Sequence, residues 1–123
     1  MPRIAVIDDD PVEHLLITEM GSDVMPDAEF VCFTTLTAFL EADVTSFTHI
    51  FLDRRLPPYN EYHETLPEIA AAGFAGNVVM MTAFDPGIET GEYDFQLIGP
   101  IDKLQIIQPE TLTAVLDGVY LAA

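Results

Sequence analysis

Three consecutive aspartates, Asp8, Asp9 and Asp10, follow a short apolar run at residues 4–7. The run predicts a buried strand, and the end of a strand is a rigid place to hold carboxylates side by side. Two such anions about 4 Å apart repel each other by about 1 kcal/mol in water and by about 4 kcal/mol at an effective dielectric constant of 20. The cluster therefore indicates a bound cation. Because its ligands would be hard oxygens at a strand's carboxyl end, we expect Mg²⁺ and, through it, a phosphate group.

Other polar residues stand where later apolar runs end. They are Asp53, Thr82 and Lys103, which is the only lysine in the chain. The carboxyl ends of parallel strands share one edge of a sheet, and open α/β sheets bind their ligands at that edge. We therefore expect these three residues to lie close to Asp8 and Asp9.

Together these side chains have the chemistry for phosphoryl transfer. Asp53 can act as a carboxylate nucleophile that forms an aspartyl phosphate. Asp8 and Asp9 can hold Mg²⁺, with help from Asp53 and from a backbone carbonyl in the following loop. Lys103 and the metal supply positive charge, and the Thr82 hydroxyl and nearby backbone N–H groups can bind phosphate oxygens.

Apolar runs and helical patterns alternate along the chain, which predicts an α/β fold. The predicted strands cover about residues 3–7, 29–33, 49–52, 77–81 and 95–98. Parallel neighbours need crossover connections, so this alternation favours a doubly wound, five-stranded parallel sheet. One crossover departs from the pattern. Residues 84–99 contain Pro86, Gly87 and Gly91 with little periodicity, so we expect the fourth helix to be short, degraded or replaced by a loop.

The first helix has clear start and stop signals. Asp10 is a good N-cap, Pro11 suits the first helical position, and Glu13 completes a capping box. Gly21 is expected to end this helix. Cys32 lies in the apolar run at 30–33 and is expected to be a small core residue.

Length and charge exclude several classes of protein. A chain of 123 residues fits a single domain, which we place at residues 1–123. The formal net charge is −17, with 21 acidic residues against four basic ones, so direct binding to nucleic acid or to anionic lipid is not expected. No run is long enough for a signal peptide or a transmembrane span, so we expect a cytoplasmic protein.

The chain resembles a receiver domain of two-component response regulators from end to end. Asp8 and Asp9 match the acidic pair of that family, and Asp53 matches its phosphoacceptor in the sequence Leu52-Asp53-Arg54-Arg55-Leu56-Pro57. Thr82 and Ala83 match the switch threonine and the small residue after it, and Lys103 matches the family's lysine. Five elements in the right order and spacing make the resemblance specific.

The resemblance implies a flavodoxin-like fold and a working cycle. A histidine kinase or histidine phosphotransferase would pass a phosphoryl group to Asp53 with Mg²⁺ bound. The family's third metal ligand, a backbone carbonyl, would come from Arg55. Such a chain is a self-phosphorylating phosphoacceptor, with slow autodephosphorylation at most, and it is not classed as an enzyme. Because the receiver takes up all 123 residues, we expect a stand-alone protein that signals by contact with an unknown downstream protein.

Three departures from the family pattern concern the switch. Leu104 follows the lysine where the family has a proline after a cis bond, so we expect a trans bond and an altered loop. Pro100 replaces the usual strand aromatic three residues before the lysine. The loop after the acceptor, residues 57–62, lacks the usual glycine. The resemblance therefore implies an atypical switch region with the acceptor chemistry intact.

Two alternatives stay open at this point. A degenerate receiver could act as a constitutive protein-interaction module that keeps its acids without using them. A haloacid-dehalogenase-type phosphatase would use Asp8 as its nucleophile and Asp10 as its acid, but Pro11 and Val12 replace the threonine region expected there. Too little chain also follows Lys103 for that family's further acidic motif.

Overall fold

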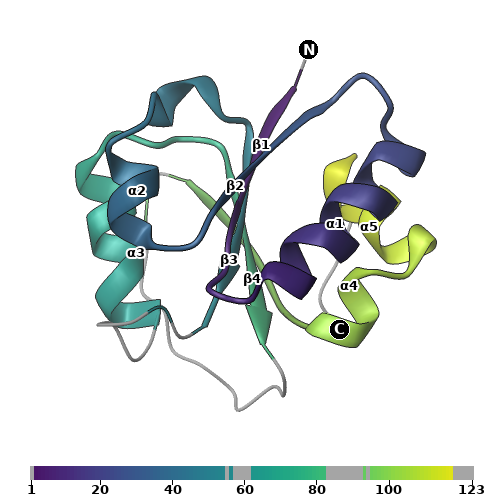
Figure 1. Ribbon diagram of the computed structural model, residues 1–123. Coiled ribbons are helices and arrows are strands. Elements are labelled where there is room, and N and C mark those ends of the chain that lie inside the picture. Colours follow the sequence, from purple (N-terminus) through teal and green to yellow (C-terminus); the bar gives the residue numbers. More distant parts are fainter. Residues whose placement is uncertain (1, 55, 57–61, 83–92, 94, 118–123) are drawn as a thin grey trace.

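A five-stranded, all-parallel sheet forms the centre of this computed structural model, which describes residues 2–54, 56, 62–82, 93 and 95–117 (Figure 1). The strand order is β2-β1-β3-β4-β5, and the predicted doubly wound, five-stranded parallel sheet is confirmed. The strands are β1 (Arg3–Ile7), β2 (Glu29–Phe33), β3 (His49–Asp53), β4 (Asn77–Thr82) and β5 (Gln96–Asp102). The helices are α1 (Pro11–Val24), α2 (Leu36–Leu40), α3 (Tyr62–Ala71), α4 (Lys103–Ile106) and α5 (Pro109–Leu116), with a short 3₁₀ turn at Val44–Ser46.

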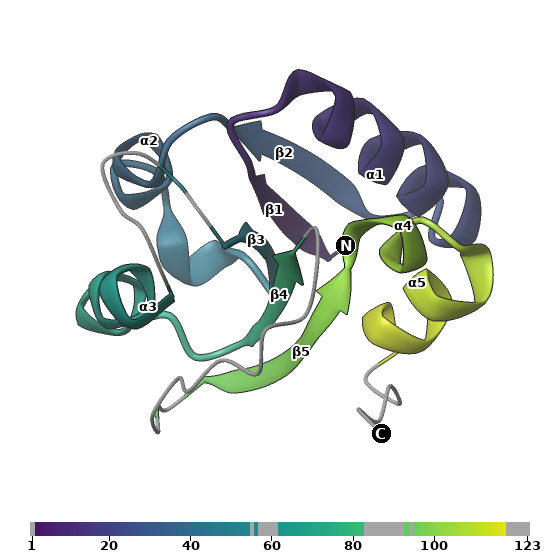
Figure 2. The ribbon, with the colours of Figure 1, turned by 90° about the horizontal axis from the view of Figure 1, so that it is seen from below.

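Helices cover both faces of the sheet, as Figure 2 shows from below. Helices α2 and α3 lie on one face, and α1, α4 and α5 lie on the other. The central strand β3 is buried along its whole length, because both of its faces are covered. Among the described helices, none has the length and apolar character needed to cross a membrane.

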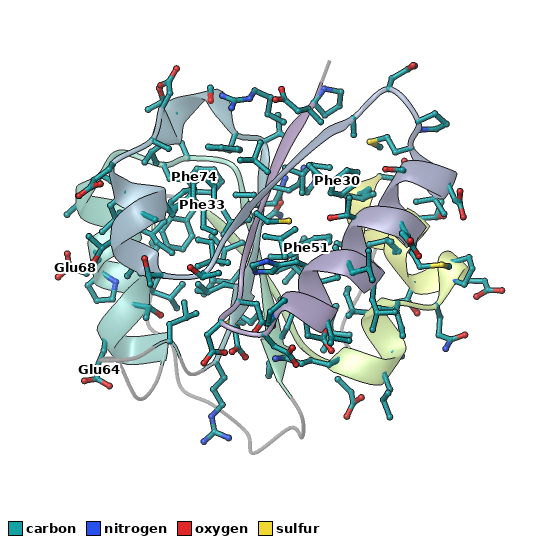
Figure 3. All side chains as sticks on the ribbon, in the orientation of Figure 1. Phe30, Phe33, Phe51, Glu64, Glu68 and Phe74 are labelled. Carbon is teal, nitrogen blue, oxygen red and sulfur yellow. The ribbon has the colours of Figure 1, made fainter. Side chains whose placement is uncertain are left out.

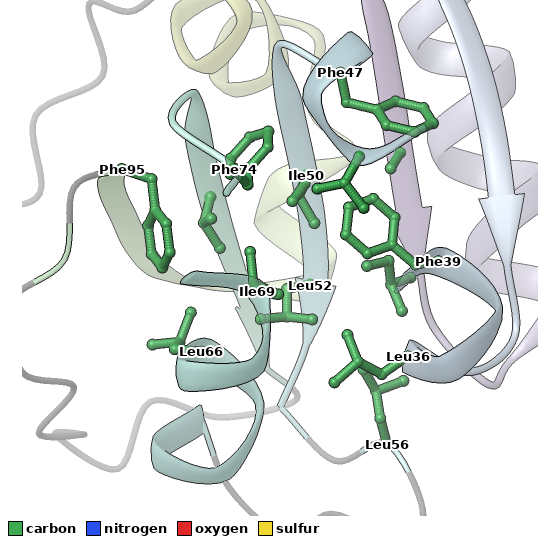
Figure 4. Close-up of a cluster of buried hydrophobic side chains, with 14 of the residues drawn as sticks. Leu36, Phe39, Phe47, Ile50, Leu52, Leu56, Leu66, Ile69, Phe74 and Phe95 are labelled. Atoms are coloured by element: carbon green, nitrogen blue, oxygen red, sulfur yellow. The ribbon is translucent and has the colours of Figure 1, made fainter. Parts of the chain in front are cut away.

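Side chains alternate between two hydrophobic clusters along each central strand. Ile50 and Leu52 of β3 join the cluster beneath α2 and α3, which is drawn in Figure 4. Phe51, between them in sequence, points to the other face and packs beneath α1 and α5 (Figure 3). This period of two is the signature of a strand. We call the second group the α1/α5 cluster, and its strand members are Ile4, Val6, Phe51, Val79, Met81, Ile98 and Ile101.

The start of α1 follows the prediction only in part. Asp10 caps the helix, and its side chain accepts a hydrogen bond from the backbone N–H of Val12 at 3.0 Å. The capping box is wrong, because the backbone N–H of Asp10 donates to Asp8 Oδ1 at 2.9 Å and not to Glu13. The strand-end carboxylate has taken the donor that a capping box would use.

Gly21 does not end α1, which continues to Val24. A Cβ atom at this position would lie 2.2 Å from Cζ of Phe30, so the glycine allows close packing of α1 on β2. Cys32 is also not a core residue. It is exposed on β2, which pairs with β1 and forms one edge of the sheet in the described part of the chain.

The C-terminal part of the sheet differs most from the prediction. β5 runs on to Asp102, well beyond the expected end near residue 98, and contains a cis peptide between Gly99 and Pro100. The Lys103–Leu104 bond is trans, as expected, and these residues begin the helical turn α4 in place of a loop. Most of the crossover between β4 and β5, including residues 83–92 where a weak helix is predicted, lies outside the described residues.

Candidate functional site

Side chains from three strand ends meet at the carboxyl edge of the sheet. The ammonium nitrogen Nζ of Lys103 lies 2.8 Å from Oδ2 of Asp8 and 3.0 Å from Oδ1 of Asp53. Asp8 is fully buried, and Asp53 is 7% exposed. The predicted convergence of these three residues is therefore present, although 95 positions separate Asp8 from Lys103.

The sheet register explains why the two aspartates are neighbours. Ile7 of β1 pairs with Leu52 of β3, so the residues that follow them, Asp8 and Asp53, lie side by side. A buried carboxylate needs its oxygens satisfied. Both oxygens of Asp8 are engaged, Oδ2 by the Lys103 ammonium and Oδ1 by the backbone N–H of Asp10. The strand end, the start of α1 and the end of β5 are thus joined through one side chain.

A group of three carboxylates at this edge could hold a metal ion. One oxygen from each of Asp8, Asp9 and Asp53 lies within 4.8 Å of the others. Asp8 and Asp53 are buried and Asp9 is exposed, so the group opens to solvent on one side. Hard carboxylate oxygens so close together suit Mg²⁺, which commonly binds one or two carboxylates and keeps several water ligands.

The remaining predicted site residues are only partly described. Thr82 ends β4 and pairs in register with Asp102, but its side chain is outside the described part of the chain. Ala83 and Arg55, with the carbonyl predicted as a metal ligand, also lie outside it. The structure therefore brings together Asp8, Asp9, Asp53 and Lys103 and leaves the phosphate-binding role of Thr82 and Ala83 as a prediction.

Two residues on α1 join this site without having been assigned to it from the sequence. The ring atom Nε2 of His14 donates to the backbone carbonyl oxygen of Asp8 at 2.5 Å. Oε2 of Glu13 is buried and has no hydrogen-bond partner among the described residues. The sequence did contain a signal for them. Glu13 and His14 come three and four residues after Asp10, and positions at this spacing lie on the same side of a helix.

The electrostatics of the site follow from burial and crowding. Burial and then the charge of Asp8 raise the pKa of Asp53 to about 6, against the opposing effect of Lys103. Burial alone would lower the pKa of Lys103, but its hydrogen bonds to Asp8 and Asp53 outweigh that and raise it. Burial is also the main cause of a raised pKa at Glu13, with Lys103 again opposing. The single ammonium group of Lys103 thus interacts with three carboxylates, those of Asp8, Asp53 and Glu13.

A metal ion at these carboxylates should stabilise the fold. Mg²⁺ at about ten times its dissociation constant would add about 1.4 kcal/mol to the free energy of unfolding, or roughly 5 °C in Tm for a domain of this size. Asp9→Asn should remove most of this shift without harming the fold, because Asp9 is exposed. Thermal melts with Mg²⁺, and with NaCl at matched ionic strength, test this prediction.

The matched control is Asp27→Asn, which also removes one exposed carboxylate but lies beyond the far end of α1. NaCl is needed because a chain with net charge −17 should be stabilised by screening alone. Equal shifts from NaCl and Mg²⁺, or an Asp9→Asn protein that responds to Mg²⁺ like the wild type, would contradict a specific metal site.

Comparisons with known proteins rest on structure alone. No protein-family model matches the chain, and no curated relative matches it. A receiver domain from Methylobacillus flagellatus is similar over 98% of this chain and 99% of its own, with a TM-score of 0.71 and 17% identity. The response regulator RcsB of Salmonella typhimurium gives a TM-score of 0.74 and 17% identity, over 99% of this chain and 63% of its own.

A third solved structure was determined with ligands. The response regulator TrrA of Thermotoga maritima, in complex with Mg²⁺ and a beryllium fluoride, gives a TM-score of 0.68 and 18% identity over 98% of this chain and all of its own. At these identities the likeness shows the fold. The chain therefore has the flavodoxin-like, CheY-like fold of response-regulator receiver domains.

Proposed function

We propose that this protein is a response-regulator receiver that accepts a phosphoryl group on Asp53 from a histidine kinase or histidine phosphotransferase. The observation that carries the proposal is the position of the Lys103 ammonium, 2.8 Å from Asp8 and 3.0 Å from Asp53 at the carboxyl edge of the sheet. This arrangement supplies a nucleophile, an acidic pair and a cation in one place. The likeness in fold supports the same proposal.

The proposed reaction is a simple displacement at phosphorus. An oxygen of the Asp53 carboxylate attacks the phosphorus atom, the bond from phosphorus to the donor atom breaks, and the donor keeps the electron pair. With a pKa of about 6, Asp53 is mostly ionised at pH 7.5 and can act as a nucleophile. Mg²⁺ held by Asp8, Asp9 and Asp53 would neutralise charge on the phosphoryl oxygens. Lys103 is placed to do the same from the other side.

Asp8 is less suited to be the nucleophile than Asp53. Its side chain is fully buried, and both of its oxygens are held by hydrogen bonds, to Lys103 and to the N–H of Asp10. Asp10, which would be the acid of a dehalogenase-type phosphatase, is occupied as the cap of α1. This geometry favours the receiver reaction over phosphatase chemistry at Asp8.

The proposal is tested by weighing the intact protein after incubation with Mg²⁺ and acetyl phosphate. The expected result is a gain of one phosphate that hydroxylamine, which cleaves acyl phosphates, removes. No gain under conditions that label a known receiver would support a constitutive interaction module instead. Steady release of phosphate from a phosphomonoester, dependent on Asp8, would support a phosphatase.

Exposed apolar side chains flank the proposed site and suit a protein donor. Val12, Leu15 and Leu104 are exposed by 59%, 58% and 76%, and they are the large hydrophobic residues that stand out as exposed in the described part of the chain. Val12 and Leu15 lie on the first turns of α1, and Leu104 follows Lys103 directly. A protein donor reaching Asp53 would cover them, whereas acetyl phosphate would not.

Polar substitutions on this rim should separate the two kinds of donor. Leu15→Ser and Leu104→Ser should each slow transfer from a phosphorylated histidine phosphotransferase by about tenfold, which corresponds to about 1.4 kcal/mol. Uptake from acetyl phosphate should be unchanged. Ala71→Ser, exposed on α3 across the sheet, is the matched control. Equal slowing with both donors would mean that these leucines act on the reaction centre and not on docking.

A further inference from the structure

A β-bulge interrupts the pairing of β5 with β4 shortly before Lys103. Val79 pairs with Ile98, and Met81 pairs with Ile101, so two residues of β5 stand opposite one residue of β4. The two are Gly99 and Pro100. An extra residue of this kind changes the direction of every side chain that follows it in the strand.

The bulge corrects the phase of β5. Ile98 and Ile101 both belong to the α1/α5 cluster, although they are three positions apart. In a regular strand, residues an odd number of positions apart point to opposite faces. Without the extra residue, therefore, Ile98 and Ile101 could not both pack on this face of the sheet.

The same phase decides where Lys103 points. Asp8 comes two residues after Val6, and Asp53 comes two residues after Phe51, and both of these apolar residues are in the α1/α5 cluster. Lys103 likewise comes two residues after the cluster member Ile101. If β5 ran from Ile98 without a bulge, Lys103 would be directed to the α2/α3 face, away from its two carboxylate partners.

The bulge depends on glycine at position 99. Gly99 has φ of +99°, in the region that side-chain-bearing residues rarely adopt. A Cβ atom there would also lie 2.8 Å from the backbone nitrogen of Ile101 and 2.9 Å from the backbone oxygen of Met80. Both contacts are with backbone atoms, so they cannot be relieved by moving a side chain.

A second restraint follows the bulge directly. The side chain of Asp102 accepts a hydrogen bond from the backbone N–H of Leu104 at 2.8 Å and so caps the turn that begins at Lys103. The backbone on either side of Lys103 is thereby fixed, by the bulge before it and by the capped turn after it.

We propose that Gly99 and Pro100 are positioning residues that direct the Lys103 ammonium to Asp8 and Asp53 by shifting β5 by one residue. The consequence for phosphoryl uptake rests on the proposed function. The placement of the ammonium does not, and it can be measured separately because Lys103 is the only lysine in the chain.

The test compares two variants that both lack the bulge. In Gly99→Val/Pro100→Val the strand keeps its length, so an unbulged β5 should turn Lys103 to the wrong face. In Gly99→Val with Pro100 deleted the strand is one residue shorter, so an unbulged β5 should leave Lys103 in its native direction. If the phase of β5 sets the direction of Lys103, the two variants should give opposite results. If the substitutions merely damage β5, both variants should give the same result.

The first readout is acetylation of the Lys103 amine by acetic anhydride, located by peptide mass spectrometry with the N-terminal amine as internal reference. The double-valine protein should react about tenfold or more faster than the wild type, because its ammonium has lost two charge-assisted hydrogen bonds. The deletion protein should react within about threefold of the wild type. Uptake from acetyl phosphate, the second readout, should fall in the first variant and persist in the second.

Circular dichroism establishes that each variant is folded before labelling. Wild-type protection of Lys103 in a folded double-valine protein, or exposure in a folded deletion protein, would overturn the proposal. If the double-valine chain does not fold, the deletion protein decides by itself: protection supports the proposal and exposure overturns it. If the wild type takes up no phosphate, the proposed function fails, and the labelling comparison still stands.

Discussion

The Asp53→Asn protein is expected to take up no phosphoryl group and, in metal-free buffer at pH 7.5, to be more stable than the wild type. The first effect follows because an amide oxygen is not a nucleophile of the required kind, so the mass gain of one phosphate should disappear. The second follows because Asp53 is buried beside Asp8, which makes its ionised form unfavourable. An ionised phosphoacceptor at position 53 should therefore lower the free energy of unfolding.

The sign of the pH dependence follows from the raised pKa. The folded protein holds a proton on Asp53 up to about pH 6, whereas an unfolded chain releases it near pH 4. The contribution of this group to stability is therefore fully present at low pH and is lost as the pH rises through about 6. The loss amounts to about 3 kcal/mol at pH 7.5 and to about half of that at pH 5.0.

Denaturant unfolding in EDTA at pH 5.0 and pH 7.5 measures this effect. Asp53→Asn should gain about 3 kcal/mol over the wild type at pH 7.5 and about half as much at pH 5.0. Asp27→Asn, which removes an exposed carboxylate far from the site, should change stability by less than about 0.5 kcal/mol at either pH. A phosphate gain that survives in Asp53→Asn would place the acceptor elsewhere.

Much of the site could be predicted from the sequence because the geometry of a parallel sheet determines where the site residues lie. Asp8 and Asp53 each follow an apolar run, and parallel strands bring their carboxyl ends to one edge. Lys103 follows a third such run, so three distant residues could be assigned to one place. The fold could be predicted for a related reason. Strands and helices alternate along the chain, and each helix can serve as the crossover connection that neighbouring parallel strands need.

The features that escaped prediction depend on exact phase and packing. The sequence pattern indicates Glu13 as a capping-box partner, but the backbone N–H of Asp10 that it would accept from donates to Asp8 instead. The same pattern predicts a helix stop at Gly21, yet this glycine allows α1 to pack closely against Phe30 of β2. Such features depend on contacts with residues that are distant in the sequence, and a local sequence pattern does not predict those contacts.

The sequence of the C-terminal strand does contain a signal for its bulge. Ile98 and Ile101 are apolar at an odd spacing, with Gly99 between them, and a glycine inside a strand pattern is a typical sign of a bulge. The predicted strand end near residue 98 is therefore wrong, and β5 continues through the bulge to Asp102. The exposure of Cys32 had no such signal, because it depends on β2 being an edge strand.

Replacing the single lysine should move metal binding and phosphorylation in opposite directions. The Lys103 ammonium lies 2.8 Å and 3.0 Å from oxygens of two of the three carboxylates that could hold Mg²⁺. A cation there repels another cation, so Lys103→Met should bind Mg²⁺ at least about tenfold more tightly. Phosphoryl uptake should nevertheless fall by about 10²-fold, because a preorganised positive group at the transferring phosphoryl is lost.

Stability gives the third arm of this prediction. In EDTA, Lys103→Met leaves Asp8 and Asp53 buried without their common partner, so the free energy of unfolding should fall by about 3 kcal/mol. Mg²⁺ should restore most of it, giving a larger metal-induced rise in Tm than in the wild type. Lys103→Arg keeps the charge and is the matched control, with Mg²⁺ affinity close to that of the wild type.

Calorimetric titration with Mg²⁺, together with melts in EDTA and in Mg²⁺, separates the possible roles of Lys103. Weaker Mg²⁺ binding in Lys103→Met would mean that the lysine organises the carboxylates for the metal and does not compete with it. Unchanged phosphoryl uptake would mean that its role is confined to the resting fold. We expect tighter metal binding together with slower phosphorylation. This combination would mean that the Lys103 ammonium neutralises the carboxylates when no metal is bound and stabilises the phosphoryl group during transfer.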